Sequence, residues 1–355
     1  MNESSSSTSS SIYKIFAILG LLLSMCCLGF MGYIAALFII IDKDINLVPA
    51  PTIDPTCEEA NCLKACIHRL PDFNTTSLTR NVSELAKKPG GYELARYRLN
   101  EQTSELDQVA TPTVPDYLKS HQANIELHRR IWDYFTSIFP NDADIHVSYM
   151  VVVMDASQGR YSARMWDLDG KWRLYVNLFD FHSPETVMNT LTHEYGHLLT
   201  LNKTQIRHIE NEYGRDTEQA EFDKMQAVCG GLFFNGFDCA RAESYLNAFG
   251  NRFWAGEVYN DWMKTFLMAD NDFDGYKNSL DEIYQKYSDQ FVTPYSSTNP
   301  REDIAESWTE FVLRPKPIGP SIANQKVLFF YEFPELVQSR QEIIQGICQY
   351  AIEQK

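Results

Sequence analysis

The longest apolar stretch of the chain is Ile15–Ile41, which carries no charged residue. A stretch of this length can cross a bilayer and exceeds the apolar core of a secretory signal. It predicts a transmembrane helix over residues 12–41, preceded by a Ser-rich and disordered tail over residues 1–11. Lys14 precedes the stretch and acidic residues predominate just after it, which favours a cytoplasmic N-terminus and an extracytoplasmic remainder. A cleaved signal and a secreted protein are the alternative.

Past this stretch, the apolar and polar positions predict a domain of mixed α and β structure. His146–Met154 and Trp172–Phe179 are short runs rich in β-branched and aromatic residues, so both are expected to be buried strands. Asp169 and Gly170, just before the second run, favour a tight hairpin turn. Tyr117–Phe139 is expected to be a helix that packs on the sheet.

Residues 183–201 carry the pattern of an amphipathic helix. Their first three residues are Ser, Pro and Glu, which suit an N-cap, a first helical position and an acidic first turn. Apolar residues follow at Val187, Met188, Leu191, Leu198, Leu199 and Leu201. Within this helix, the motif His193-Glu194-Tyr195-Gly196-His197 sets two imidazoles one turn apart on one face. Two such histidines with a glutamate between them are typical of a zinc-protease site.

Zinc in such a site needs a third protein ligand, and the source of that ligand distinguishes the protease classes. The metzincin continuation of the motif fails, since Thr200 and Lys203 stand where it has glycine and histidine. The other route is a glutamate from elsewhere in the chain. Glu210, Glu212 and Glu218 are candidates close in sequence, but none of them has a carboxylate partner on a well-capped helix.

A better candidate lies far downstream, on a second capped helix. Asn299 can cap this helix and Pro300 suits its first turn. An apolar stripe follows at Ile304, Trp308, Phe311 and Val312. Glu302 and Glu306 then lie one above the other on the same face. Glu302 can bind the metal while Glu306 accepts a hydrogen bond from the far nitrogen of a ligating imidazole, which fixes its tautomer.

The two helices together resemble the gluzincin metallopeptidases, and in particular the lethal-factor-like catalytic domain and related bacterial zinc-binding metallopeptidases. The resemblance rests on the histidine motif and on the pattern Tyr-x-x-Thr-Asn-x-x-Glu-x-x-Ala-Glu that begins at Tyr295. It covers two blocks, residues 183–201 and 291–313. The implied zinc ligands are His193, His197 and Glu302. The implied general base is Glu194, the implied transition-state donor is Tyr295, and Glu306 supports a ligating histidine.

The same resemblance implies an α+β, zincin-like metallopeptidase domain with a small mixed sheet, an HExxH active-site helix and a largely helical C-terminal lobe. The expected activity is hydrolysis of peptide bonds in a polypeptide substrate by a zinc-activated water. In zincins the substrate backbone adds to the edge strand beside the motif helix, so Arg173–Leu178 is expected to be that strand. A non-catalytic extracytoplasmic surface protein that binds metal or calcium is the alternative, although such a protein would not need Glu194.

The segments around the motifs give an expected domain order. Residues 42–115 are expected to form a stalk and a cysteine-containing N-terminal region, because prolines and glycines recur there. Residues 116–355 are expected to form the zinc metallopeptidase domain. The interval between the two motifs, residues 202–290, is expected to be a helical insertion.

Six cysteines lie beyond the apolar stretch, an even number that is compatible with disulfides in an oxidising compartment. They are Cys57, Cys62, Cys66, Cys229, Cys239 and Cys348. Cys229 and Cys239 flank a glycine-rich segment and are the expected local pair. One of the three N-terminal cysteines is expected to pair with Cys348. The alternative to these disulfides is a zinc site formed by the three N-terminal cysteines, although their spacing contains no C-x-x-C pair.

Acidic residues dominate the chain, whose formal net charge is −16. Nucleic acid is therefore excluded as an expected partner. One acidic segment is a candidate calcium loop, with Asp270, Asp272, Asp274 and Asp281 at positions 1, 3, 5 and 12. Lys277 at position 8, and aspartate instead of glutamate at position 12, depart from the pattern. A solvated acidic loop between helices is the alternative.

Overall fold

The structure is a computed structural model, and it describes residues 60–70, 73, 82–100, 103, 105–140, 147–168, 171–209, 219–268 and 273–353. All of these belong to one compact unit, Asp54–Lys355. The expected tail over residues 1–11 and the expected membrane helix over residues 12–41 lie outside them. Within the described ranges, no helix is both long and apolar enough to cross a membrane.

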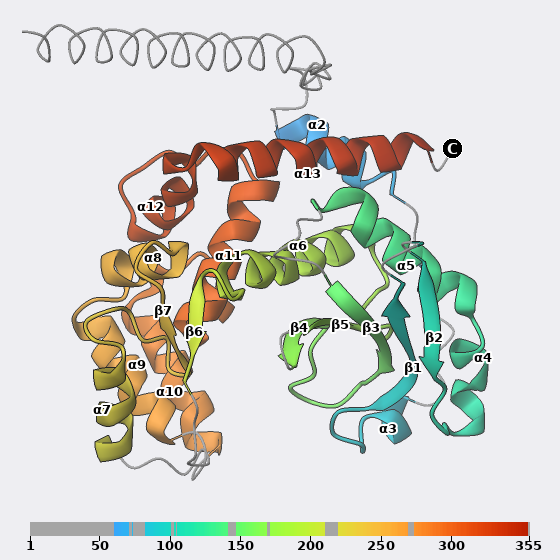
Figure 1. Cartoon of the computed structure of the whole chain (residues 1–355), viewed down its shortest axis with the longest axis horizontal. Coiled ribbons are helices and arrows are strands. Elements are labelled where there is room, and N and C mark those ends of the chain that lie inside the picture. The colour runs from blue at the N-terminus through green and yellow to red at the C-terminus, as the bar shows by residue number, and fades with distance from the viewer. Residues whose placement is uncertain are drawn as a thin grey trace, which may run out of the picture. The chain divides into compact units, whose positions relative to one another are not determined.

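A five-stranded mixed sheet forms one part of this unit (Figure 1). Its strands are β1 (Tyr92–Leu99), β2 (Leu106–Ala110), β3 (Val147–Met154), β4 (Ala163–Leu168) and β5 (Lys171–Asn177). The strand order is β2-β1-β3-β5-β4, with β3 and β5 parallel and the other neighbours antiparallel. The two predicted strands are confirmed as β3 and β5. The pairing of Leu168 with Lys171 confirms the predicted hairpin.

Two expectations about this sheet are wrong. Arg173–Leu178 does not provide an edge, because β5 lies between β3 and β4, and β4 is the edge strand on this side of the sheet. The region 42–115 is also more than a stalk, since β1 and β2 pair with the rest of the sheet. The sheet needs both strands to bury its apolar face, so the domain begins well before residue 116.

The two faces of the sheet differ because side chains alternate along each strand. One face is apolar and buried, with Tyr97, Met150, Val152, Met165, Leu174 and Val176 on it. The helices α5 (Ile125–Ile138) and α6 (Pro184–Leu201) lie on this side (Figure 1). The hydroxyl of Tyr97 on β1 bonds to Nδ1 of His128 on α5 at 2.8 Å. The predicted helix over residues 117–139 is confirmed in its longer part by α5, and shorter helical pieces precede it.

The rest of the unit is mainly helical, as expected for the C-terminal lobe (Figure 1). Its helices are α7 (Gln219–Val228), α8 (Tyr245–Phe253), α9 (Glu257–Met268), α10 (Phe273–Lys286), α11 (Pro300–Leu313), α12 (Ile322–Phe329) and α13 (Pro334–Glu353). Short 3-10 helices are η3 (Asp116–Leu118), η4 (Ser288–Gln290), η5 (Tyr295–Thr298) and η6 (Phe330–Glu332). The N-terminal helices are α2 (Ala60–Ile67), α3 (Val82–Leu85) and α4 (Lys119–Gln122). The described part of the 202–290 insertion is largely helical and also holds a small hairpin of β6 (Ile206–His208) and β7 (Asp238–Ala240).

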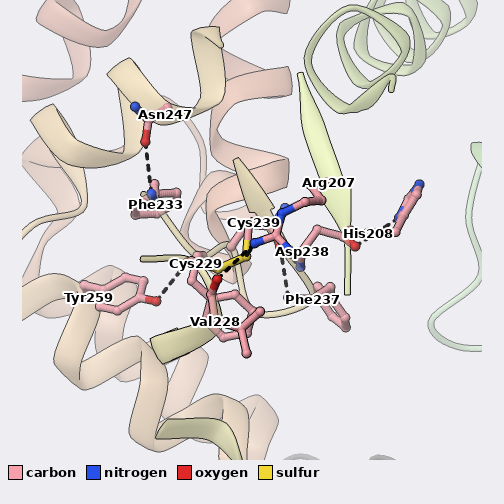
Figure 2. The surroundings of a disulfide bond; sticks show 12 residues. Arg207, His208, Val228, Cys229, Phe233, Phe237, Asp238, Cys239, Asn247 and Tyr259 are labelled. Carbon is pink, nitrogen blue, oxygen red and sulfur yellow. Dashed lines mark hydrogen bonds and ion pairs between the residues drawn. A yellow bond between two sulfur atoms is a disulfide. The ribbon is translucent and has the colours of Figure 1, made fainter. Parts of the chain in front are cut away.

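Two predicted disulfides are confirmed by sulfur atoms at bonding distance. Cys66 on α2 pairs with Cys348 on α13, and so joins positions 282 residues apart in the sequence. Cys229 pairs with Cys239. Figure 2 shows Arg207 beside this second pair, where its guanidinium donates to the carbonyl oxygen of Val228. The side chains of Cys57 and Cys62, the other two cysteines beyond the apolar stretch, lie outside the described residues.

The expected calcium loop does not form over its described part. Asp270 and Asp272 lie outside the described residues, but α10 begins at Phe273 and is helical through Asp274 and Asp281. A twelve-residue calcium loop would need these positions in a turning loop, where carboxylates and a carbonyl converge. Helical backbone does not provide that arrangement.

Candidate metal centre

The motif helix α6 is fixed at its N-terminus and buried along its length. The side chain of Ser183 accepts a hydrogen bond from the backbone N–H of Thr186 at 3.1 Å, and Pro184 occupies the first turn, as predicted. Tyr195, one residue after the motif glutamate, stacks on Phe139 at the end of α5. This packing leaves the opposite side of α6, which carries His193 and His197, turned toward α11.

The second helix, α11, is held in place by its predicted cap. The side-chain oxygen of Asn299 accepts hydrogen bonds from the backbone N–H groups of Arg301 and Glu302, at 3.0 and 3.1 Å. The helix crosses α6 at Gly196, where an added Cβ would lie 3.0 Å from Trp308 Cδ1. Glycine at this position therefore lets the two backbones approach, which brings Glu302 within reach of the histidines.

His193, His197 and Glu302 converge on one point. Nε2 of His193 lies 2.9 Å from Oε2 of Glu302, and Nε2 of His197 lies 3.2 Å from the same oxygen. The two Nε2 atoms are 3.1 Å apart. These residues form a group whose ligand atoms all lie within 4.8 Å of one another, and the group could hold a metal ion. The predicted set of ligands is thus brought together.

The donor chemistry of this group fits a cation. Nδ1 of His193 lies 2.7 Å from Oε1 of Glu306, whose other oxygen accepts from the Thr293 hydroxyl at 2.6 Å. A proton on Nδ1 that donates to Glu306 leaves a lone pair on Nε2 of His193, directed at Glu302. Lone pairs that converge in this way repel one another unless a positive charge lies between them. Two imidazoles and one carboxylate are a donor set that zinc prefers, with a further position left open.

The electrostatics of the group agree with a cation site. Burial alone would raise the pKa of Glu302, but the two imidazoles outweigh burial and hold this pKa well below its usual range. Burial would lower the pKa of His193, but hydrogen bonds to Glu302 and Glu306 raise it to about 10. A positive charge is therefore favoured at this point, and a bound metal would take the place of the proton.

Glu194 follows the first histidine, but it is not part of the group whose ligand atoms converge. It accepts a hydrogen bond from the backbone N–H of Met165 on the edge strand β4. Burial raises the pKa of Glu194, and the two histidines counteract this only in part. A buried carboxylate with a raised pKa, close to a metal group, is suited to accept and return a proton.

Tyr295 lies at the start of η5, beside His193. Its ring centre is 5.8 Å from that of His193, and 44% of the residue is exposed. Burial of the hydroxyl, with Glu302 and Glu194 nearby, raises the pKa of Tyr295, so the hydroxyl keeps its proton and can donate it in a hydrogen bond. The predicted donor is therefore placed beside the metal group.

A cleft of about 820 Å³ opens onto the metal group. The residues that line it include His193, Glu194, Glu302, Tyr295 and Ala163. The edge strand β4 and the loop before it form part of its wall. Residues of α6, α11 and β4, together with Tyr295, therefore line the same cleft.

Two contacts of the site were not predicted from the sequence. Thr293 orients Glu306, and Met165 binds Glu194 through its backbone. Thr293 lies in the block 291–313 that carries the family resemblance, so the sequence offered some reason to consider it. The contact of Met165 uses only its backbone, and a backbone contact does not depend on the residue type. The rival ligands Glu210, Glu212 and Glu218 lie outside the residues whose side chains are described.

Comparison of the chain with protein-family models, with curated proteins and with solved structures gave no match.

Proposed function

We propose that this protein is a zinc-dependent endopeptidase. The observation that carries the proposal is the position of Glu194: it lines the same cleft as the ligands His193 and Glu302, but it is not one of the converging ligands. A metal site that only stabilises a fold has no need of a buried carboxylate beside an open cleft. The proposed reaction does need one.

Each residue has a defined task in the proposed mechanism. Zinc held by the three ligands would make a bound water acidic and polarise the substrate carbonyl. Glu194 accepts a proton from the attacking water and later delivers it to the leaving amine. The Tyr295 hydroxyl donates a hydrogen bond to the carbonyl oxygen as negative charge develops there. Glu306 keeps the His193 ring oriented, with its proton on Nδ1.

The free edge of β4 is the proposed binding site for the substrate backbone. The carbonyl oxygen of Ser162 accepts a hydrogen bond from the backbone N–H of Asn177, the last residue of β5. The N–H of Met165 instead points away from β5 and donates to Glu194. Backbone groups alternate between the two sides of a strand, so Ala163 and Asp167 also face the free edge. A polypeptide in extended conformation can pair with these groups and place a peptide bond beside Glu194.

The location of the protein is part of the proposal. Two disulfides within the domain favour an oxidising compartment, and therefore a catalytic domain outside the cytoplasm that is anchored by residues 12–41. Added protease should release the domain from intact cells. A mature N-terminus at or beyond residue 42 would show instead that the segment is a removed signal.

The variant Glu194→Gln tests the proposed activity. It keeps the shape of the side chain but cannot take up a proton, so cleavage of unfolded proteins should fall by about 10²–10⁴-fold while bound zinc stays unchanged. Glu126→Gln, an exposed acid in the first turn of α5, is the control and should keep full activity. Equal cleavage by wild type and Glu194→Gln, or zinc binding without any cleavage by wild type, would favour the non-catalytic metal-binding protein.

A further inference from the structure

The outer face of the sheet, which points away from α5 and α6, carries arginines and aromatic residues in ordered rows. In the first row, Arg98 on β1 pairs with Tyr149 on β3, Tyr149 with Arg173 on β5, and Arg173 with Trp166 on β4. Residues that pair across neighbouring strands project on the same face. The second row is Arg96, Val151, Tyr175 and Arg164. We call these eight residues, together with Lys171, the outer arginine face.

Aromatic rings pack against two of the four guanidinium groups of this face, those of Arg164 and Arg173. The guanidinium carbon of Arg173 lies 5.1 Å from the ring centre of Tyr149. That of Arg164 lies 4.4 Å from the ring centre of Trp166 and 5.2 Å from that of Tyr175. Stacking of this kind orders a guanidinium while its N–H groups at the rim stay available for an anion.

The positive charge of this face is neutralised only in part by its neighbours. Arg96 forms an ion pair with Glu93 at 2.8 Å. Arg98, Arg164 and Arg173 form no ion pair with any residue that the structure describes. The face carries five cationic residues, Lys171 included, and two acidic residues, Glu93 and Asp107. Asp107 on β2 pairs with Arg98 on β1. This concentration of positive charge lies on a chain whose net charge is −16.

The outer arginine face is continuous with the cleft. The strand β4 contributes Arg164 and Trp166 to the face, and Ala163 of the same strand lines the cleft together with Tyr161 and Ser162. The guanidinium of Arg164 also lies 5.3 Å from the ring centre of Tyr161. A polypeptide that pairs with the free edge of β4 would therefore leave the cleft beside this face.

We propose that the outer arginine face binds an acidic stretch of the polypeptide substrate, outside the segment that is cleaved. This proposal rests on the proposed endopeptidase function. Carboxylates match the guanidinium group in geometry and can accept two parallel hydrogen bonds from it. Single-stranded nucleic acid is less suited, because it needs free aromatic surfaces for its bases, and the rings of Tyr149 and Tyr175 already contact arginines.

Binding is measured on the full-length Glu194→Gln protein, so that no cleavage interferes. The probe is a fluorescently labelled peptide of alternating glutamate and glycine, and anisotropy reports its affinity. The double substitution Arg164→Gln and Arg173→Gln should weaken binding by about tenfold or more, since charged hydrogen bonds are lost. Arg129→Gln, an exposed arginine on α5 at the opposite side of the sheet, is the matched control and should bind as tightly as its parent.

Further readouts make the result decisive. Binding should change the fluorescence of Trp166, a signal that Trp166→Phe removes, and should weaken as salt is added. Lys171→Glu, at the exposed start of β5, provides a second variant if the double variant does not fold. Equal affinity of the double variant and its parent would overturn the proposal, as would tighter binding of single-stranded nucleic acid or of dextran sulfate. Because binding is measured without turnover, failure here is distinct from failure of the endopeptidase proposal.

Discussion

Glu306 contacts His193 but is not one of the three residues whose ligand atoms converge, so we propose that it acts on the metal through His193. Its carboxylate lies 2.7 Å from Nδ1 of His193 and is held by the Thr293 hydroxyl. Glu306→Gln removes the negative charge that keeps the proton of His193 on Nδ1 and so leaves Nε2 free to bind metal. The affinity for zinc should therefore fall by about 10–100-fold. Competition with a coloured chelator measures the affinity. Glu310→Gln, one turn further along α11, is the control, and an equal loss in both variants would argue against a specific role for Glu306.

Tyr295 offers a second test at the scale of one residue. Tyr295→Phe removes only the hydroxyl, so fold and zinc content should persist while turnover falls by about 10²–10³-fold, the share of an oxyanion donor. Initial rates on a fluorogenic peptide give this value. Tyr331→Phe changes a tyrosine of η6 that does not line the cleft, and it should leave the rate unchanged. Unchanged turnover in Tyr295→Phe would remove Tyr295 from the mechanism.

The residues of the site differ in how far the sequence could predict them. His193, Glu194 and His197 follow from local geometry, because an i, i+4 spacing on a capped helix fixes their mutual positions. Glu302 comes from another helix, and its prediction needed the cap at Asn299 and the resemblance between the two blocks. The contact between Glu194 and the backbone of Met165 depends on tertiary packing, so no residue pattern could have indicated it.

At the scale of elements, the crossing of α6 and α11 determines the site. A Cβ at Gly196 would lie 3.0 Å from Trp308 and 3.2 Å from the backbone of Ala305, and both neighbours are fully buried. Gly196→Ala should therefore separate the helices and destabilise the protein by about 1–3 kcal/mol, as overpacking does elsewhere. Urea unfolding measures this loss, and zinc affinity should fall with it. A variant as stable as wild type would show that the crossing tolerates a wider spacing.

Two elements explain where the pattern of apolar positions failed. The strand β4 was not predicted, because Trp166 and Leu168 are large apolar residues on its open face and obscure the alternation expected of a half-buried strand. Its recognition as the edge strand required the whole sheet order. The acidic run before Asp281 resembled a calcium loop, yet α10 forms there because Leu280, Ile283 and Tyr284 pack against the core at helical spacing.

At the scale of the whole molecule, the disulfide between Cys66 and Cys348 ties α2 to the last helix. It links residues 282 positions apart, whereas the pair Cys229 and Cys239 closes a loop of 10. A cross-link that closes a longer loop restricts the unfolded chain more. Replacing Cys66 and Cys348 by serine should cost about 2–5 kcal/mol and lower the melting temperature more than the same change at the shorter pair. The opposite order would contradict this account.

We propose that one zinc ion, held by His193, His197 and Glu302, makes the protein an endopeptidase that acts in its cleft. The most direct test is to remove all metal with a chelator and then titrate zinc back while both bound metal and peptide cleavage are recorded. We expect no cleavage by the metal-free protein, and a linear recovery that ends at about one equivalent of zinc. Glu194→Gln should take up the same equivalent without recovery. Cleavage that persists without metal, or one equivalent bound by wild type with no cleavage, would contradict the claim.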